Sequence, residues 1–524
     1  MDHCKAVEDV DRISALPDDL LHLILGRLGF APAVTKTAVL SRRWRHVWPH
    51  ARRLRFKDDD KFLKRKRDFA GFVDWVLSHR GDGDMESLKI LFKEKGRASP
   101  EKINEWLRYA ARRVVGSVKI DVGPKLKEPD HDVAVELPIH GGRATSISLS
   151  LSNHRLRLPS ATSATYEALT KLTLDSLWFT DDGMSTLLGD FVMSCCPRLR
   201  RLEISRARGL TRLVLRTDVL QELDISSAHD LQTLDVTAPN LRLIALAFSA
   251  VPLLLGDISM DKVMIRIVAP RLEEFHRNVF PYRPPVLDIR GLESVRRLKY
   301  IYLDTHGKYH STSDLWLLQN CPAAQHVHVN LHHSSTSFAA DELVDLTAPE
   351  GNAPLFANVR SMSIIICGVP RHHLVASISS LLMRCPHLTS ITIKGTYFPQ
   401  DQRGFKCACE ALLTDRCTVV HGKLALESLQ EVKIIGFGGT AEEMQLVSFL
   451  FGSSNSLERA NIQLRVNTKV EAGVNIFHQL TRMKIPPCAD QERWSFQKTE
   501  REKVHLDVRL DTVIDRERHS LIIS

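Results

Sequence analysis

The first fifty residues carry apolar side chains at the spacing of short helices. Apolar residues recur every four positions over residues 20–28, with further leucines beside them, which predicts one amphipathic helix that stops at Gly29. A second helix is expected over residues 33–40. A third is expected over residues 41–48, where two tryptophans lie four positions apart on one face before Pro49 ends the helix.

From about residue 144 the pattern changes to L-x-x-L-x-L. The clearest triplets begin at Leu169, Leu199, Leu210, Leu220, Leu231, Leu241, Leu388 and Leu429. From 199 to 241 the first positions advance by ten or eleven residues, so a repeat of about 21 residues holds two triplets. Alternate residues of a strand face one side, so each triplet predicts a short strand with one apolar face. Such strands bury their apolar faces by stacking, which is typical of a leucine-rich-repeat solenoid.

Other segments predict helices between strands. Before the repeats, helices are expected over residues 68–79 and 100–112, with a strand over 87–92. Elsewhere the triplets lie 29 to 41 residues apart, which leaves room for helical returns, and a Cys-Pro pair precedes three of them.

Near the C-terminus, residues 432–435 predict a strand and residues 440–451 a helix, with Thr440 and Glu443 placed as a capping box. The predicted fold class is therefore α/β, with a three-helix head followed by an irregular solenoid.

Composition and charge narrow the class of protein. The 524 residues are 44% apolar and 25% charged, as expected of a folded chain, and the net charge is +9. Residues 1–67 hold 16 Lys and Arg against 9 Asp and Glu, so the basic excess lies at one end, which argues against nucleic-acid binding. The acidic start without an apolar leader predicts an intracellular chain with reduced cysteines, and no apolar stretch predicts a membrane span.

Three patterns suggest sharper chemistry, and a structural interpretation is favoured for each. Residues 436–440 (Gly-Phe-Gly-Gly-Thr) follow a strand and open a helix, but they lack the lysine of a phosphate-binding loop. Four residues are potential zinc ligands but lack the paired C-x-x-C spacing of a zinc site. They are Cys407, Cys409, Cys417 and His421. Surface histidines are expected at 326, 328, 332 and 333. No catalytic motif is found, so we expect no catalytic residue, no metal and no cofactor.

Residues 11–50 resemble an F-box, the helical motif that docks substrate receptors onto a cullin-RING ubiquitin ligase through a Skp-type adaptor. With the repeats and the segment 426–464, most of the chain is similar to the plant F-box, leucine-rich-repeat and FBD family. The resemblance implies adaptor contacts at Leu16, Pro17, Leu20, Ile24, Leu25, Leu28, Val39, Leu40, Trp44 and Trp48. The turn at residues 29–32 departs from the usual motif. Alternatively, some of these residues, such as Leu20 and Trp44, form the internal core.

The expected domains are an F-box-like head (9–55), a lead-in (56–143), the solenoid (144–425), an FBD-like unit (426–490) and a charged tail (491–524). The resemblance implies a non-catalytic substrate-recognition subunit of an SCF-type E3 ligase that binds an unknown target protein. The alternatives are a ligase-independent scaffold with a degenerate F-box and a receptor for a small molecule.

Target contacts are expected at positions between the apolar ones, with candidates Lys171, Thr173, Arg200, Arg201, Glu203, Gln221 and Glu222. We expect a cytoplasmic or nuclear protein without membrane contacts. The basic run 64–67 (Lys-Arg-Lys-Arg) fits either an import signal or a solvated linker.

Overall fold

The structure is a computed structural model of the chain and divides into two units, which are described separately. Unit 1 comprises residues 1–241 and 262–269, and unit 2 comprises residues 242–261 and 270–524. The structure describes residues 16–58, 68–92, 98–122, 134–139, 142–159, 165–179, 184–228, 230–248, 264–279, 286–304, 312–332, 356–367, 374–395, 426–454, 456–465, 470–482, 494–499 and 503–509.

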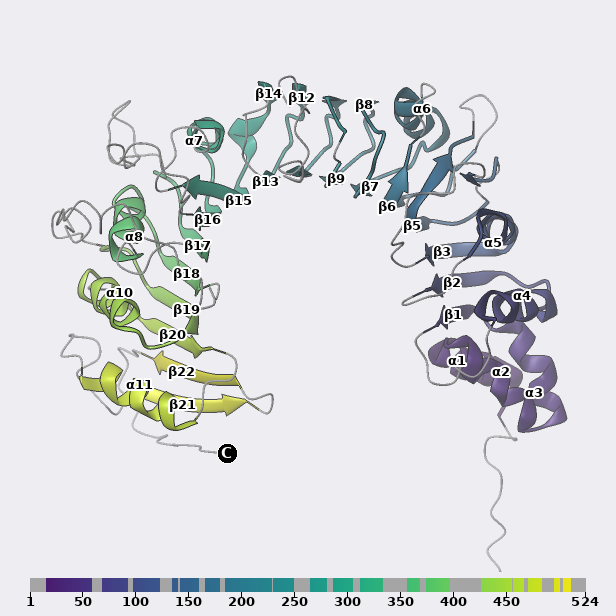
Figure 1. Cartoon of the computed structure of the whole chain (residues 1–524), viewed down its shortest axis with the longest axis horizontal. Helices are drawn as coiled ribbons and strands as arrows, with labels where there is room; N and C mark the ends of the chain where they lie inside the picture. The colour runs from purple at the N-terminus through teal and green to yellow at the C-terminus, as the bar shows by residue number, and fades with distance from the viewer. Residues whose placement is uncertain are drawn as a thin grey trace, which may run out of the picture. The chain divides into compact units, whose positions relative to one another are not determined.

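Unit 1 begins with a helical head (Figure 1). Its helices are α1 (Asp18–Leu28), α2 (Ala31–Lys36) and α3 (Arg42–Val47), with 3₁₀ turns η1 (Thr37–Val39) and η2 (Trp48–His50). The predicted stop of α1 is confirmed, because Gly29 takes a left-handed conformation with φ of 54°. The second helix begins earlier than expected, with Pro32 in its first turn, and it tightens into η1 rather than continuing to residue 40.

A parallel sheet follows the head. Its strands pair in the order β1 (Arg53–Lys57), β2 (Met85–Leu91), β3 (Val114–Asp121), β5 (Ser146–Arg157), β6 (Lys171–Trp178), β7 (Arg201–Ser205) and β9 (Glu222–Ser226), and β4 (Val135–Glu136) pairs with the end of β5. Parallel neighbours need a crossover, and three of these are the helices α4 (Phe69–His79), α5 (Pro100–Arg113) and α6 (Met184–Cys195). The strands β2 and β3 lie in the segment expected as a lead-in, and β1 crosses the expected boundary between head and lead-in at residue 55. The sheet therefore starts well before residue 144.

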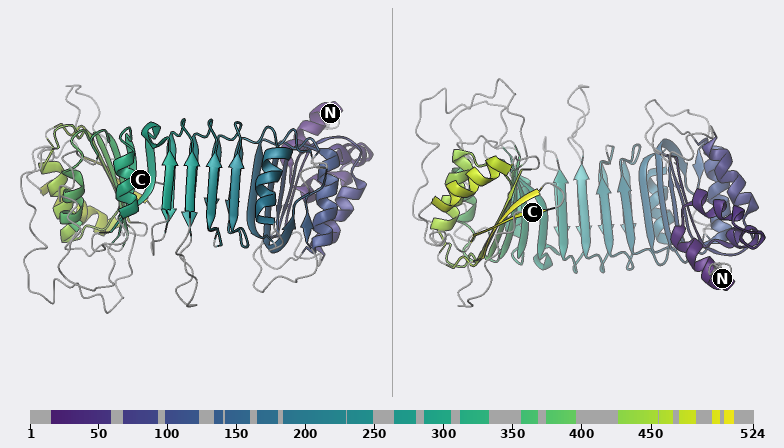
Figure 2. Two further views of the ribbon diagram at one scale, coloured as in Figure 1. Left: turned by 90° about the horizontal axis from the view of Figure 1, so that it is seen from above. Right: turned by 90° about the horizontal axis from the view of Figure 1, so that it is seen from below.

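A second parallel sheet in unit 1 joins β8 (Arg212–Arg216), β10 (Thr233–Thr237) and β12 (Met264–Val268). From β7 to β10 the chain alternates between the two sheets, with about ten residues from one strand to the next. The prediction of two strands in each repeat of about 21 residues is therefore confirmed. Figure 2 shows such strands running side by side in one direction.

Unit 2 also contains a run of parallel strands. Its strands pair in the order β11 (Leu243–Phe248), β13 (Glu274–Val279), β15 (Arg297–Asp304), β16 (His326–His332), β17 (Ser361–Cys367), β18 (Ser390–Gly395), β19 (Glu431–Phe437) and β20 (Arg459–Leu464). Strand β14 (Val286–Arg290) and the 3₁₀ turn η3 (Leu292–Ser294) connect β13 to β15. The helices α7 (Thr312–Asn320), α8 (Leu374–Leu382) and α10 (Ala441–Gly452) are crossovers between these strands (Figure 1).

The C-terminal part of unit 2 departs from the parallel repeat. After α11 (Val470–Arg482), the strands β21 (Trp494–Thr499) and β22 (Lys503–Arg509) form an antiparallel pair, and β22 also pairs with β20. The described part of the expected charged tail is therefore a β-hairpin that extends the sheet.

The Cys-Pro pairs form a recurring turn before a strand. The amides of Leu199, Ala324 and Leu388 donate to the carbonyls of Cys196, Cys321 and Cys385 at 3.1, 3.1 and 3.3 Å. The thiols are free and buried, and burial raises the pKa of the Cys321 and Cys385 thiols to about 12. These cysteines are therefore protonated at neutral pH and fill the core.

Candidate functional site: an apolar surface on the helical head

The head has a small internal core. Leu21 and Leu25 of α1 are fully buried, and they share this core with Ala31 and Val34 of α2. Trp44 and Trp48, which are 4% and 7% exposed, also belong to the core. The predicted adaptor contacts Leu25, Trp44 and Trp48 therefore lie inside the head, as the alternative interpretation expected for the tryptophans.

The head also exposes large apolar side chains to solvent. Leu20, Leu23, Leu28, Val39 and Leu40 are 44, 57, 45, 82 and 64% exposed. They are five of the twelve large apolar side chains that are exposed in the described chain, although they span only residues 20–40. Such a concentration marks an interaction surface more often than isolated exposed leucines do.

Three further predicted residues border these five side chains. Pro17 is exposed, and Leu16 and Ile24 are half-buried. Together they form what we call the head surface: Leu16, Pro17, Leu20, Leu23, Ile24, Leu28, Val39 and Leu40. Seven of its members were predicted from the sequence. Leu23 was missed because the predicted stripe followed a spacing of four, whereas Leu23 follows Leu20 at a spacing of three on the same helical face.

Polar contacts hold the two halves of the head surface in place. Arg43 at the start of α3 donates to Asp18 Oδ1 from Nε at 2.8 Å and from Nη2 at 2.6 Å. The Ser41 hydroxyl accepts a hydrogen bond from the Trp44 amide and caps the start of α3. The cap fixes the direction in which the chain passes from Leu40 into the helix. These contacts anchor the η1 turn beside the N-terminal end of α1.

The unusual turn at residues 29–32 faces the following strand. The Arg55 amide donates to the Gly29 carbonyl at 2.6 Å, and Phe30 forms a bridge with Arg55 of β1. Ala31 and Pro32 are buried. The turn therefore joins the head to the sheet. None of its residues belongs to the head surface.

The target-contact candidates come together on neighbouring strands β6, β7 and β9. Glu203 accepts a hydrogen bond from Thr173 at 2.7 Å and ion pairs from Lys171 at 3.2 Å and Arg201 at 2.5 Å. Arg201 also pairs with Glu222 at 2.8 Å. Burial raises the pKa of Glu203, but the Thr173 hydrogen bond and these two cations outweigh it and hold the pKa below its usual range. The charges of this region are therefore largely satisfied within the chain. Arg200 and Gln221 lie one position before the strands.

The glycine-rich segment 436–440 is a structural turn, as expected. Thr440 and Glu443 form a capping box at the start of α10. The amides of Gly438 and Thr440 both donate to Glu443 Oε2 at 3.0 Å, so a carboxylate of the chain already occupies the site that a phosphate would need.

The other predicted chemistry gains no structural support. The residues Lys64–Arg67, Cys407, Cys409, Cys417, His421 and His333 lie outside the described residues. Among the residues that the structure does describe, no group of three or more His, Cys, Asp or Glu side chains is arranged to hold a metal ion. His326 is exposed and His328 half-buried on β16, on one face of the strand as predicted. No helix in the described ranges has the length and hydropathy of a membrane span.

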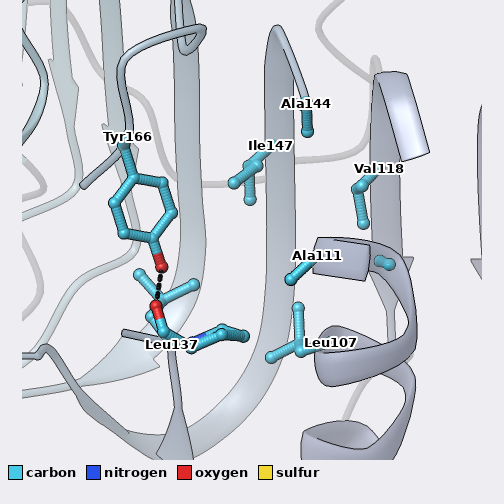
Figure 3. Close-up of a pocket in the computed structure, with 9 residues that line it drawn as sticks. Leu107, Ala111, Val118, Leu137, Ala144, Ile147 and Tyr166 are labelled. Carbon is cyan, nitrogen blue, oxygen red and sulfur yellow. Dashed lines mark hydrogen bonds between the residues drawn. The ribbon is translucent and has the colours of Figure 1, made fainter. Parts of the chain in front are cut away.

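A small cavity lies between α5 and the sheet of unit 1 (Figure 3). It is lined by apolar side chains that include Leu107, Val118 and Ile147, and the Tyr166 hydroxyl beside it donates to the Pro138 carbonyl. Its volume of about 10 Å³ is close to the minimum for one water molecule. This cavity is a packing space and does not fit the small-molecule receptor alternative.

Three domain families match the chain in order. The F-box domain family matches residues 13–56. The family described as "At1g61320/AtMIF1, LRR domain" matches residues 76–297, which includes β2 and β3, and the FBD family matches residues 425–462.

Several relatives are F-box/LRR-repeat proteins of Arabidopsis thaliana. F-box/LRR-repeat protein At3g58880 is 25% identical over 473 residues, which cover 84% of this chain and 89% of that protein. F-box/LRR-repeat protein 13 is 23% identical over 487 residues, with 90% and 93% covered. F-box/LRR-repeat protein At3g03360 is 28% identical over 283 residues, and this match spans 51% of this chain and only 55% of that protein.

The helical head and the leucine-rich sheets define an F-box protein with repeats. The chain carries an F-box, a leucine-rich-repeat domain and an FBD domain in that order, and its relatives that match over most of their length are F-box/LRR-repeat proteins of a plant. F-box/LRR proteins are in general non-catalytic substrate receptors of SCF-type ubiquitin ligases, and the F-box in general binds a Skp-type adaptor.

Proposed function

We propose that this chain is the substrate-recognition subunit of an SCF-type E3 ubiquitin ligase. Its head docks a Skp-type adaptor, and its repeat sheets bind a target protein for ubiquitination by the partner enzymes. The observation that carries the proposal is the head surface, whose five most exposed apolar side chains lie within residues 20–40 of the F-box match.

The residues of the head surface contact the adaptor, and the buried residues of the head support this surface from inside. The exposed leucines and Val39 contribute directly, because each side chain that is transferred from water to a protein interface contributes about 1 kcal/mol or more. Leu25, Trp44 and Trp48 act from inside by fixing the helices that present this surface. Ubiquitin transfer itself requires no residue of this chain.

The test is copurification of the full chain with a Skp-type adaptor. The variant L20D/L40D places two charges on the head surface, and its matched control I139D/V219D places the same charges on two other exposed apolar residues of unit 1. We expect the control to bind like the wild type and L20D/L40D to lose the adaptor. Circular dichroism and the unfolding midpoint of each variant show that the head remains folded.

Two results would contradict the proposal. If L20D/L40D retains full adaptor binding, the head surface is not the docking site. If the folded wild type fails to copurify with any Skp-type adaptor, the scaffold with a degenerate F-box becomes the better interpretation.

A further inference from the structure

Three basic side chains are aligned across the first strands of the unit 1 sheet. Arg55 on β1 pairs in register with Lys89 on β2, and Lys89 pairs with Lys119 on β3. All three are exposed, whereas their chain neighbours such as Phe56 and Ile90 are buried. The three side chains therefore share the face of the sheet opposite to α4 and α5 (Figure 1). We call them the basic ladder.

The basic ladder is not neutralised within the described part of the chain, where no hydrogen bond or ion pair reaches its three side chains. The adjacent cation Arg53, by contrast, pairs with Glu86 at 2.7 Å. Further along the same face, Lys171 and Arg201 are both paired with Glu203. For these three cations of the same sheet the chain thus supplies a carboxylate.

Alignment of like charges on adjacent strands is unfavourable. Neighbouring strands lie about 4.8 Å apart, and like charges directly opposite each other destabilise the pairing. An anionic partner would relieve this repulsion and gain the attraction of three cations. Hydroxyl groups beside the ladder offer further donors to such a partner. The Oγ atoms of Ser87 on β2 and Ser117 on β3 lie 2.8 Å apart. Ser148 on β5 pairs in register with Lys119.

The small extent of the basic ladder favours a short acidic protein segment over a nucleic acid as its ligand. The three outward positions of β5 next to it are serines, and the strands β6 to β9 carry the carboxylates Asp175, Glu203 and Glu222 on the same face. A nucleic acid needs an extended basic surface, whereas the ladder spans three strands and borders acidic ones.

We propose that the basic ladder binds an acidic segment of the target protein, with its Asp or Glu carboxylates opposite Arg55, Lys89 and Lys119. This inference rests on the proposed function, because it names the chemistry of the target. It places the first target contact on β1 to β3, before the strands that the sequence pattern pointed to.

The test is the binding of a short fluorescent peptide rich in Glu to the full chain. We expect R55Q/K89Q/K119Q to weaken binding about tenfold, because each exposed ion pair contributes modestly. The matched control R108Q/R112Q/R198Q removes the same charge from exposed arginines that lie off the ladder, and we expect wild-type affinity. Wild-type binding should also weaken as salt is raised.

Three results would overturn the inference. The first is absence of peptide binding by the wild type. The second is an equal loss in the ladder variant and its control, which indicates only a general effect of net charge. The third is a single-stranded oligonucleotide that binds more tightly than the peptide through the same three residues.

Two cross-checks separate this inference from the proposed function. The ladder variant should copurify with the adaptor like the wild type, and L20D/L40D should bind the peptide like the wild type. If only adaptor binding fails in the wild type, the ligase role is lost and the peptide site stands. If only peptide binding fails, the ligase role stands and the inference is lost.

Discussion

The guanidinium Nη2 of Arg43 lies 2.6 Å from Oδ1 of Asp18, so the first turn of α3 is held against the first turn of α1. The two side chains are 37 and 60% exposed, and such a pair contributes little to the free energy of unfolding. Its position matters more, because Asp18 directly follows Pro17 and Arg43 lies three residues after Leu40. The contact therefore aligns two parts of the head surface.

The first prediction concerns this pair. We expect R43Q to change the free energy of unfolding by less than about 1 kcal/mol but to lower adaptor affinity several-fold, because the Val39–Leu40 turn is less well held. D18N should have the same effect, and the double variant should be no worse than either single variant. Calorimetric titration with the adaptor measures this cycle, and additive losses would refute the alignment role.

The second prediction compares a buried residue of the head, Trp44, with an exposed one, Leu40. Trp44 is 4% exposed, so W44A should destabilise the head by about 3–5 kcal/mol through the cavity it leaves. Leu40 is 64% exposed, so L40A should change stability by less than about 0.5 kcal/mol while weakening the adaptor complex. Urea unfolding and adaptor binding are measured on both. A stable W44A variant, or a strongly destabilised L40A variant, would reverse this assignment.

The third prediction uses two glycines in helices. A Cβ on Gly189 of α6 would collide with the backbone carbonyl of Val214 on β8, so G189A should destabilise unit 1 by about 1–3 kcal/mol. Gly452 at the end of α10 has no atom near the equivalent position, so G452A should be neutral or slightly stabilising. Unfolding midpoints of the two variants test this close packing, and equal midpoints would contradict it.

The sequence predicted the core better than the surfaces. Leu199, Leu202 and Ile204 form one predicted triplet and are all 1% exposed or less, because the strict spacing of a repeat leaves one arrangement. The periodicity of the head could not tell buried Trp44 from exposed Leu20, since two sides of a short helix can both be apolar. The basic ladder needs the strand register, which joins residues far apart in the sequence.

Other features had no periodic signal. The hairpin of β21 and β22 lies in a charged segment without the leucine pattern. In β15 the register shifts between residues 298 and 301, where Tyr300 has a φ of 61°, and no glycine marks this bulge. This irregularity brings Tyr300 beside two histidines.

These histidines lie on β13 and β16, the two strands of unit 2 that flank β15. The ring centroids of Tyr300 and His328 are 5.0 Å apart, and those of Tyr300 and His276 are 6.3 Å apart. Burial lowers the pKa of His276 and His328, and the nearby Lys299 and Lys394 lower the pKa of His328 further. Glu274, which accepts a hydrogen bond from Arg297 and lies 3.1 Å from His276 Nε2, has its pKa lowered to about 2.

The fourth prediction follows from the sign of these shifts. Because the pKa values of His276 and His328 are lowered in the native state, these two side chains bind fewer protons there than in the unfolded chain as the pH falls from about 7 to 5, so stability decreases. The contribution of Glu274 is lost only at lower pH, as the pH falls from about 4.5 towards 2. Urea unfolding of H276Q/H328Q should therefore show a smaller decrease in the free energy of unfolding between pH 7 and pH 5, the range in which an ordinary histidine titrates. H387Q, which changes an exposed histidine of the same unit, should keep the wild-type slope, and an unchanged slope in H276Q/H328Q would show that these two side chains do not cause it.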